Sequence, residues 1–273
     1  MPTPRITELP DAVRALIEKN SGPITDMGTV HGGYNSSIAA CVRTGRRSPH
    51  TLFVKGLPLD HPRVWTQARE AKINPHVRDL TPALHWYEEA DGWSLLGFEY
   101  VEGDHADYTP GASDLSQISA TMGQLARLRA PGVELKTMTD RYRTYVESPA
   151  ELKWFEGDSL LHTDWNPHNV IITKAGAVLV DWAWASTGAA WIDSALWLLW
   201  LLWLIADGHT AAQAESVAAT HPAWKSAPSA GLDTLARVQE RLWDSIAEQS
   251  PDNWSQTMKA AARAWNTHRQ SQD

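Results

Sequence analysis

The spacing of hydrophobic and polar positions divides the chain into two parts with different periods. In the first part, short apolar runs bounded by turn residues predict antiparallel strands at ITDMGTV, SIAACV, TLFVK and both arms of ALHWYEEADGWSLLGFEYV. Asp91-Gly92, between the two arms, is a hairpin-turn signal. Helical spacing predicts helices over residues 11–19 and 62–73. We therefore expect a small antiparallel sheet with one inserted helix.

After Val101 the pattern becomes mainly helical. One hairpin is predicted there, with strands VIIT and AVLVD and a turn at Ala175-Gly176. Helical periodicity predicts helices over residues 115–128, 191–206, 211–219, 232–247 and 254–267. The expected fold class is α+β, with two lobes: a β-rich lobe over residues 1–102, a hinge near residues 99–103, and a helical lobe over residues 103–273.

The most apolar segment favours a buried helix over a membrane span. Its apolar run covers residues 195–206, which is 12 residues, and lies between Asp193 and Asp207. A membrane-spanning helix needs about 20 apolar residues. A helix that is hydrophobic all round and shorter than this is typical of a protein core. We therefore expect no membrane partner.

Composition and charge indicate the cellular compartment and the kinds of partner to expect. Cys41 is the single cysteine of the 273 residues, so no internal disulfide is possible, and the first residues lack the pattern of a signal peptide. We expect a cytoplasmic protein.

The net charge is −8, and residues 103–273 hold 20 acidic against 13 basic residues. This disfavours a nucleic-acid partner and is compatible with either a cationic substrate or a solvated acidic surface. No protein partner is evident.

Three polar residues surround the predicted hairpin of the second part. Asp164 and Asn169 belong to the loop HTDWNPHN before it, and Asp181 ends its return strand in VDWAWA. If the two strands pair, Asn169 and Asp181 come to neighbouring ends of one ribbon. A carboxylate and an amide oxygen there would suit Mg²⁺. Asp164 would remain beside the metal to accept a proton from an alcohol, which predicts a phosphoryl-transfer site.

The first part supplies the groups that such a site needs for a nucleotide. Lys55 ends the strand TLFVK, and Glu70 follows 15 residues later on a predicted helix, where it can pair with Lys55. The Gly-bearing turn HGGYNSS lies between two strands, and its backbone N–H groups can approach phosphate oxygens. Ser36 and Ser37 are equally compatible with capping of this turn.

Together these parts resemble the kinase fold, and specifically the aminoglycoside phosphotransferase family with its small-molecule kinase relatives. The matching residues run from Gly32 to Leu199. They are GGYNSS, Lys55, Glu70, the linker LLGFEYVEG, HTDWNPHN, VDWAWA and Asp193 in WIDSALW. The spacing H-x-D-x-x-x-x-N with a downstream strand-ending Asp is the most specific of them.

The resemblance implies a role for each matching position. Asp164 would be the catalytic carboxylate, Asn169 and Asp181 the magnesium ligands, and His162 and Asp193 braces of the catalytic loop. Lys55, held by Glu70, would contact the nucleotide phosphates. The remaining nucleotide contacts would come from the loop and from the backbone of the hinge: Gly33, Tyr34, Asn35, Ser36 and Ser37, then Glu99, Tyr100 and Val101.

The sequence departs from relatives at identifiable points. Thr163 occupies a position where antibiotic kinases of this family usually have Gly. The chain also lacks the G-x-G-x-x-G, D-F-G and A-P-E segments of protein kinases, so a protein substrate is not expected. Candidates for contact with the acceptor are two tryptophans beside the catalytic segment and three acids of the helical lobe: Trp165, Trp184, Asp207, Glu240 and Asp244.

The sequence thus predicts a Mg²⁺-dependent phosphotransferase that uses ATP or GTP to modify a hydroxyl of a small molecule. An antibiotic acceptor, with a role in resistance or self-protection, is the leading hypothesis. A metabolic kinase acting on a sugar or an amino alcohol is the alternative. A nucleotide-binding pseudokinase is disfavoured, because the set Lys55, Glu70, Asp164, Asn169 and Asp181 is intact.

Overall fold

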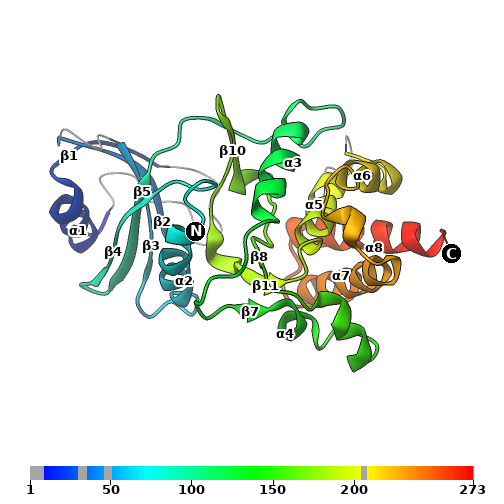
Figure 1. Cartoon of the computed structure of the whole chain (residues 1–273). Coiled ribbons are helices and arrows are strands. Elements are labelled where there is room, and N and C mark those ends of the chain that lie inside the picture. The colour runs from blue at the N-terminus through cyan, green and yellow to red at the C-terminus, as the bar shows by residue number, and fades with distance from the viewer. Residues whose placement is uncertain (1–8, 30–35, 46–50, 204–207, 273) are drawn as a thin grey trace. The chain divides into compact units, whose positions relative to one another are not determined.

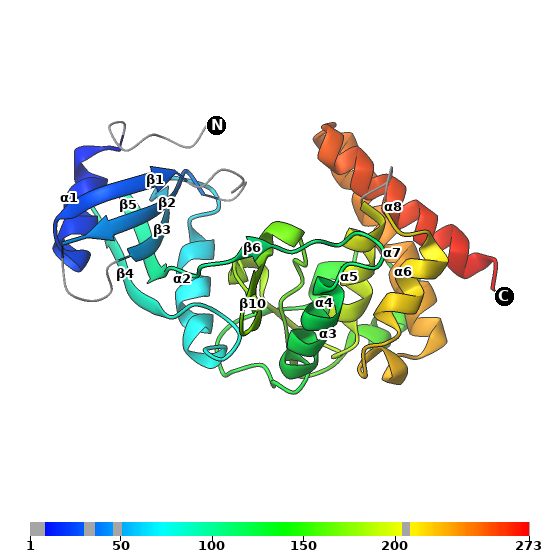
Figure 2. The same cartoon turned by 90° about the horizontal axis from the view of Figure 1, so that it is seen from above.

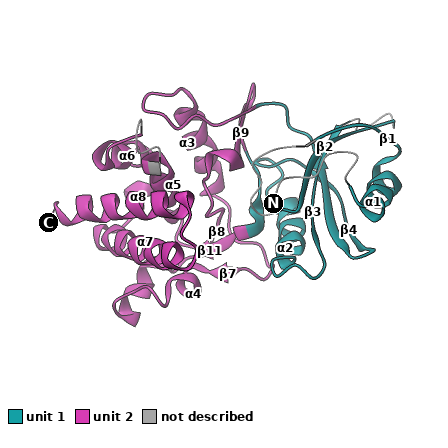
Figure 3. Cartoon of the chain, turned by 180° about the vertical axis from the view of Figure 1, so that it is seen from behind, with its two compact units in different colours: residues 1–103, 179–183 teal, residues 104–178, 184–273 magenta. Residues whose placement is uncertain are grey.

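A computed structural model describes residues 9–29, 36–45, 51–203 and 208–272. Internal contacts divide the chain into two units (Figure 3). Unit 1 contains Met1–Gly103 together with Leu179–Ala183, and unit 2 contains Asp104–Val178 and Trp184–Asp273. The sequence predicted one boundary near Glu102 and Gly103. It did not predict that Leu179–Ala183 belong to unit 1, which places Asp181 in the same unit as Lys55 and Glu70.

Unit 1 is built on a five-stranded antiparallel sheet. Its strands are β1 (Ile24–Thr29), β2 (Ile38–Thr44), β3 (Thr51–Pro58), β4 (Leu84–Ala90) and β5 (Trp93–Glu99). Their order across the sheet is β1-β2-β3-β5-β4. In the central strand β3, Lys55 pairs with Ala39 of β2 and Leu96 of β5. The β4–β5 turn is the predicted Asp91-Gly92 pair, and both residues have the positive φ of such turns, 51° and 82°.

Two helices lie on opposite faces of this sheet (Figures 1 and 2). Helix α1 (Asp11–Ser21) packs Val13, Leu16 and Ile17 into a core cluster with residues of β2, β3 and β5. Helix α2 (Trp65–Ile73) contacts β4 and β5. It begins later than the predicted residue 62, because the preceding residues form turns in which Val64 N–H bonds to the His61 carbonyl at 2.9 Å. Helix α2 places Glu70 in contact with Lys55.

Unit 2 contains two small three-stranded sheets. The first has the order β10-β9-β6 and includes the predicted hairpin, β9 (Val170–Thr173) and β10 (Gly176–Leu179), with β6 (Asp104–His105). The hairpin turn lies at Lys174-Ala175, one residue before the predicted position. The second sheet, β7-β11-β8, consists of β7 (Lys136–Thr137), β8 (Ser159–Leu161) and β11 (Ser186–Gly188). Strands as short as β6, β7 and β11 have no sequence periodicity that could predict them.

The rest of unit 2 is helical. Its α-helices in the described residues are α3 (Asp114–Leu125), α4 (Met138–Tyr142), α5 (Ile192–Trp203), α6 (Ala211–Ala218), α7 (Ser229–Gln249) and α8 (Asn253–Gln270). Every side chain from Ile192 to Leu202 is buried, so α5 is the core helix that its composition predicted. Helices α7 and α8 lie side by side (Figures 1 and 2) and both α6 and α8 contact α5. No helix of the described chain has the length and apolarity needed to cross a membrane.

A nearly buried arginine joins three helices of unit 2. Arg269 of α8 contacts Glu215 of α6 at 2.6 Å and Asp233 of α7 at 2.7 Å, and it donates to Ser229 Oγ at 2.9 Å. Its side chain is 9% exposed. Arg263 of α8, in contrast, is 58% exposed and bonds to Glu240 at 3.1 Å.

Arg269→Met should lower the free energy of unfolding by about 3 kcal/mol or more, because it leaves two largely buried carboxylates without their cation. Arg263→Met is the matched control on the same helix, and it should cost less than about 1 kcal/mol. Urea unfolding followed by circular dichroism measures both. Equal destabilisation by the two variants would contradict the role given to Arg269.

Candidate active site

Unit 1 brings three predicted site residues into one ionic cluster. Lys55 Nζ lies 2.5 Å from Glu70 Oε2 and 3.2 Å from Asp181 Oδ1. The side chains of Lys55 and Glu70 are 8% and 4% exposed, and that of Asp181 is 19% exposed. Burial of a charge is tolerated only when partners compensate for lost hydration. The cluster therefore holds all three groups in fixed positions.

The charges of this cluster do not balance. Burial by itself would lower the pKa of the Lys55 ammonium, but Asp181 and Glu70 outweigh it and raise the pKa above its ordinary value. Burial raises the pKa of Glu70, with Lys55 opposing and Asp181 adding to the effect. Lys55 thus remains charged and is shared by two carboxylates. With both carboxylates ionised, the cluster has a net negative charge. Asp181 is the more exposed of the two acids, so a further cation would bind there.

Trp182 fixes the segment that carries Asp181 to unit 1. Its backbone N–H bonds to Glu70 Oε1 at 3.4 Å, and its indole N–H bonds to Thr81 Oγ1 at 3.2 Å. Two residues before Asp181, the Leu179 N–H bonds to the Leu80 carbonyl at 2.7 Å. The segment is therefore held on both sides of Asp181, which keeps this carboxylate next to Lys55.

The predicted nucleotide loop is described only in part. Gly33, Tyr34 and Asn35 lie outside the described residues. Ser36 and Ser37 lead into β2, and the Ser37 N–H bonds to the Gly56 carbonyl at 3.0 Å. The Ser37 amide is thus engaged within the sheet.

The predicted hinge lies at the end of β5. Glu99 and Tyr100 are exposed, and Val101 is partly buried. Glu99 already donates its backbone N–H to the Ala83 carbonyl at 2.8 Å. An adenine at this hinge would have to bond to the Glu99 carbonyl or to the backbone of Tyr100 and Val101, so the contribution expected of Glu99 is restricted to its carbonyl.

Unit 2 holds the predicted catalytic loop between β8 and the short 3₁₀ helix η4 (Pro167–Asn169). Asp164 is partly buried, and its backbone N–H bonds to His162 Nδ1 at 3.3 Å. Asn169 donates its side-chain N–H to the Asp164 carbonyl at 3.2 Å. This bond engages the amide nitrogen of Asn169, so its amide oxygen is the atom that would serve as the predicted metal ligand.

Asp193 at the start of α5 bonds to the backbone of the same loop. Its carboxylate accepts the N–H groups of His162 and Thr163, each at 2.9 Å. His162 and Asp193 are 1% and 2% exposed. The bracing role was predicted for these two residues. Asp193 accepts the two amides that precede Asp164, and the His162 ring accepts the amide of Asp164 itself.

Backbone strain occurs at two positions of the site. In the described chain, the non-glycine residues with positive φ are Asp91, Thr163 and Asp181, and the last two have φ of 67° and 62°. Asp91 belongs to a hairpin turn, where this conformation is required. Thr163 is β-branched, for which positive φ is a genuine outlier. Such strain persists only where the surrounding structure stabilises it, and it is typical of functional sites.

Two residues that the sequence did not indicate hold the loop in unit 2. Tyr108 is buried and donates its hydroxyl to the Trp165 carbonyl at 2.9 Å. Arg141 of α4 donates to the Thr163 hydroxyl at 2.7 Å. They precede the loop by 57 and 22 residues. No local sequence signal could have identified them, because such contacts depend on the tertiary fold.

The candidate acceptor residues have different outcomes. Trp165 was a candidate for contact with the acceptor, but its side chain is fully buried next to the His162 ring, which argues against such a contact. Trp184 is partly buried and stays a candidate. Glu240 and Asp244 form ion pairs with Arg263 and with Lys259, so their charges are compensated between α7 and α8. Asp207 lies outside the described residues.

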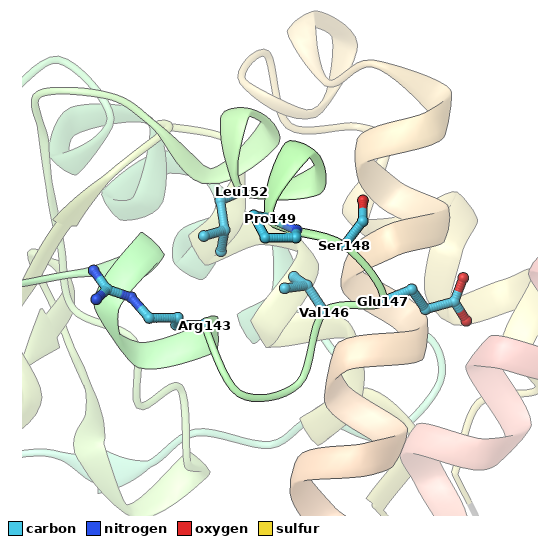
Figure 4. Close-up of a pocket in the computed structure, with 6 residues that line it drawn as sticks. All are labelled: Arg143, Val146, Glu147, Ser148, Pro149 and Leu152. Carbon is cyan, nitrogen blue, oxygen red and sulfur yellow. The ribbon is translucent and has the colours of Figure 1, made fainter.

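Unit 2 also has a surface pocket of about 340 Å³ beside α4 (Figure 4). The residues that line it are Arg143, Val146, Glu147, Ser148, Pro149 and Leu152. Arg143 is paired with Asp140, and Glu147 with Arg241. None of the predicted site residues lines this pocket, so it gives no support to any of the proposed acceptor contacts.

The ligating groups present suit a magnesium ion only if a bound nucleotide supplies further ligands. No cluster of three His, Cys, Asp or Glu side chains suited to a metal occurs in the described part of the chain. Mg²⁺ bound together with a nucleotide uses one or two carboxylates, substrate phosphates and water. Asp181 and the Asn169 amide oxygen are of the right type. Asn169 belongs to unit 2 and Asp181 to unit 1, so their joint coordination stays a prediction.

Comparisons by sequence find no relative, whereas comparisons by structure find many. No protein-family model and no curated protein matches the chain. Choline kinase LicA from Streptococcus pneumoniae has a TM-score of 0.61 at 13% identity, over 94% of this chain and 98% of its own. A thermostable mutant of aminoglycoside phosphotransferase APH(4)-Ia, in ternary complex with AMP-PNP and hygromycin B, has a TM-score of 0.62 at 15% identity, over 92% and 98%.

A macrolide phosphotransferase has the same architecture. MphH from Brachybacterium faecium has a TM-score of 0.53 at 15% identity, over 94% of this chain and 98% of its own. At such low identity these similarities establish the fold and nothing finer. They confirm the predicted α+β kinase-like fold and its resemblance to aminoglycoside phosphotransferases and their small-molecule kinase relatives.

Asp193 should give the protein a recognisable pH dependence. Burial raises the pKa of its carboxyl from 3.8 to about 6, while the N–H groups of His162 and Thr163 lower it. A pKa that is higher in the folded state means that protonation favours folding. This contribution is fully present below the unfolded-state pKa and is lost as the pH rises through about 6.

From about pH 7 to about pH 4, the wild type should therefore gain unfolding free energy relative to Asp193→Asn, by ~3 kcal/mol at most. Urea unfolding at both pH values measures the difference. Glu134→Gln is the control, because Glu134 is exposed, and it should leave the wild-type pH dependence unchanged. Parallel pH profiles for wild type and Asp193→Asn would contradict the raised pKa.

Proposed function

We propose that the protein transfers the γ-phosphoryl group of a nucleoside triphosphate to a hydroxyl of a small molecule. The observation that carries the proposal is the buried Lys55 shared by Glu70 and Asp181, with Asp181 at a strained φ of 62°. A lysine held by a helix glutamate and a carboxylate placed for a metal are recurring parts of phosphoryl-transfer sites. The kinase-like fold supports the same reaction class.

Unit 1 would bind the donor. The Lys55 ammonium would contact the α and β phosphates, and Glu70 would keep it oriented. Asp181 and the Asn169 oxygen would hold Mg²⁺, which when bound neutralises charge on the transferred phosphoryl group. The loop of Gly33 to Ser37 and the backbone at Glu99 to Val101 complete the proposed nucleotide contacts. The choice between ATP and GTP would be made at that backbone.

Unit 2 would position the acceptor hydroxyl. Asp164 would accept or orient its proton as the oxygen attacks phosphorus. The Asp164 backbone is held through its own N–H, through its carbonyl and through the neighbouring amides on Asp193. This rigidity suits a reaction in which positioning supplies most of the catalysis.

An antibiotic hydroxyl is the leading acceptor, with resistance or self-protection in the cytoplasm as the role. Solved structures that share the fold include an aminoglycoside and a macrolide phosphotransferase, which supports this choice. A metabolic amino alcohol or sugar is the alternative, supported by the choline kinase LicA. The ion-paired state of Glu240 and Asp244 weakens the case for a polycationic acceptor. A pseudokinase is disfavoured, because the catalytic set is complete.

The deciding experiment is a nucleotide-consumption screen of the purified protein with Mg²⁺ and ATP or GTP. The panel should contain aminoglycosides, macrolides, amino alcohols and sugars, and mass spectrometry should detect the phosphorylated product. We expect one class to be phosphorylated at a hydroxyl. Absence of any product across the panel, with nucleotide bound, would favour the pseudokinase alternative.

Asp164→Asn should lower kcat by about 100-fold or more while nucleotide affinity stays close to that of the wild type. The variant removes the proton acceptor and leaves the groups of unit 1 in place. Asp158→Asn, an exposed acid of the same unit, is the control and should keep its activity. A wild-type rate in Asp164→Asn would show that another group accepts the proton.

Asp181→Ala should abolish the dependence of nucleotide binding on Mg²⁺, because it removes the anionic metal ligand. Titration calorimetry with and without Mg²⁺ measures this effect directly. Asp60→Ala, at an exposed acid of unit 1, should bind the Mg²⁺ complex as the wild type does. If Asp181→Ala binds that complex with unchanged affinity, the metal site lies elsewhere.

A further inference from the structure

The strained backbone at Thr163 raises the question of what stabilises it. A positive φ of 67° is unfavourable for a β-branched residue, whereas glycine adopts it freely. Thr163 directly precedes Asp164, so any relaxation of its backbone would move the carboxylate that we place at the reacting hydroxyl. The hydrogen-bond partners of Thr163 in the described residues belong to unit 2.

One guanidinium nitrogen is central to these contacts. Arg141 Nη1 lies 2.7 Å from Thr163 Oγ1 and 2.9 Å from Ser186 Oγ. Both hydroxyls donate in turn to the Trp184 carbonyl, each at 2.9 Å, and Arg141 Nη1 itself lies 3.2 Å from that carbonyl. The hydroxyls therefore accept from Arg141 and donate to Trp184, which forms a closed network around one carbonyl.

The network joins two segments that are distant in sequence. Arg141 belongs to the short helix α4, which contacts β11, and Ser186 begins β11. The Arg141 guanidinium also lies 5.8 Å from the centre of the Trp184 ring. The backbone N–H of Thr163 donates a hydrogen bond to the Asp193 carboxylate. Thr163 is thus held by its hydroxyl and by its amide. Arg141 holds the hydroxyl together with the Trp184 carbonyl, and it does not contact the amide.

We propose that Arg141 is a positioning residue, which holds the Thr163 hydroxyl and so keeps the strained backbone from which Asp164 projects. As a statement about catalysis this rests on the proposed function. The guanidinium suits the task because it presents several donors in a fixed plane and stays charged. A lysine ammonium also has several N–H donors, but it rotates at the end of a flexible chain and lacks the fixed plane that orients Arg141 Nη1.

The kinetic test uses a matched pair of variants. Arg141→Met should lower kcat by about 10- to 100-fold with nucleotide KM changed less than about twofold, because a small displacement of a catalytic group costs this much. Arg143→Met is the control from the adjacent turn. Its side chain is 68% exposed and pairs with Asp140, so its kcat should equal that of the wild type. Arg141→Lys should restore only part of the loss.

A double-mutant cycle tests whether the effect passes through Thr163. Thr163→Val keeps the strain and removes the hydroxyl, so adding Arg141→Met to it should cause less than about a threefold further loss. Thr163→Gly removes the strain, and Arg141→Met should cost less in that background than in the wild type. Multiplicative losses in both cycles would overturn the proposal and leave Arg141 with a general packing role.

Hydrogen exchange separates this proposal from the proposed function. If the wild type phosphorylates no acceptor, the proposed function fails, and backbone exchange over residues 161–166 decides the role of Arg141. Arg141→Met should speed exchange there by at least about tenfold, since a hydrogen bond to a charged group is lost. Arg143→Met should not. Unchanged exchange in Arg141→Met, with an unchanged Tm, would overturn the proposal.

Discussion

One buried ammonium group shared by two carboxylates joins three segments of unit 1. Lys55 projects from the central strand, Glu70 from α2, and Asp181 from a segment 126 residues after the lysine. None of these charges could be buried alone at reasonable cost. The mutual requirement explains why residues 179–183 belong to unit 1, although the chain on both sides of them belongs to unit 2. It also leaves a net negative charge at Asp181, where a metal cation would be favourable.

The same segment shows how hydrogen bonds stabilise an unfavourable backbone. Asp181 has positive φ, and the residue after it is held by Glu70 and Thr81. Thr163 has positive φ, and it is held by Asp193 and Arg141. In each unit, a residue with positive φ lies at or next to a carboxylate of the candidate site and is held by hydrogen bonds from several neighbours. Pre-organisation of this kind lowers the reorganisation needed during reaction, which suits phosphoryl transfer.

The fold sets the reaction class only weakly. Proteins with this architecture include a choline kinase, an aminoglycoside phosphotransferase and a macrolide phosphotransferase, and a shared fold does not transfer a substrate. The side chains of the site therefore carry the functional argument. Pairing of the acids on α7 and α8 also changes the view of the acidic second part, because several of its charges stabilise helix contacts and do not form an open acidic surface.

The sequence by itself determined the strands of unit 1, the buried helix α5 and the identity of the polar residues around the hairpin. These features follow from local periodicity, from turn residues such as Asp91-Gly92 and from the spacing of Asp164 and Asn169. Only the tertiary structure decided that residues 179–183 join unit 1 and that Trp165, although next to Asp164, is fully buried. It also decided that Tyr108 and Arg141 hold the predicted catalytic loop. These outcomes depend on contacts between distant segments, where burial of charge and satisfaction of hydrogen bonds are settled by packing that no local pattern encodes.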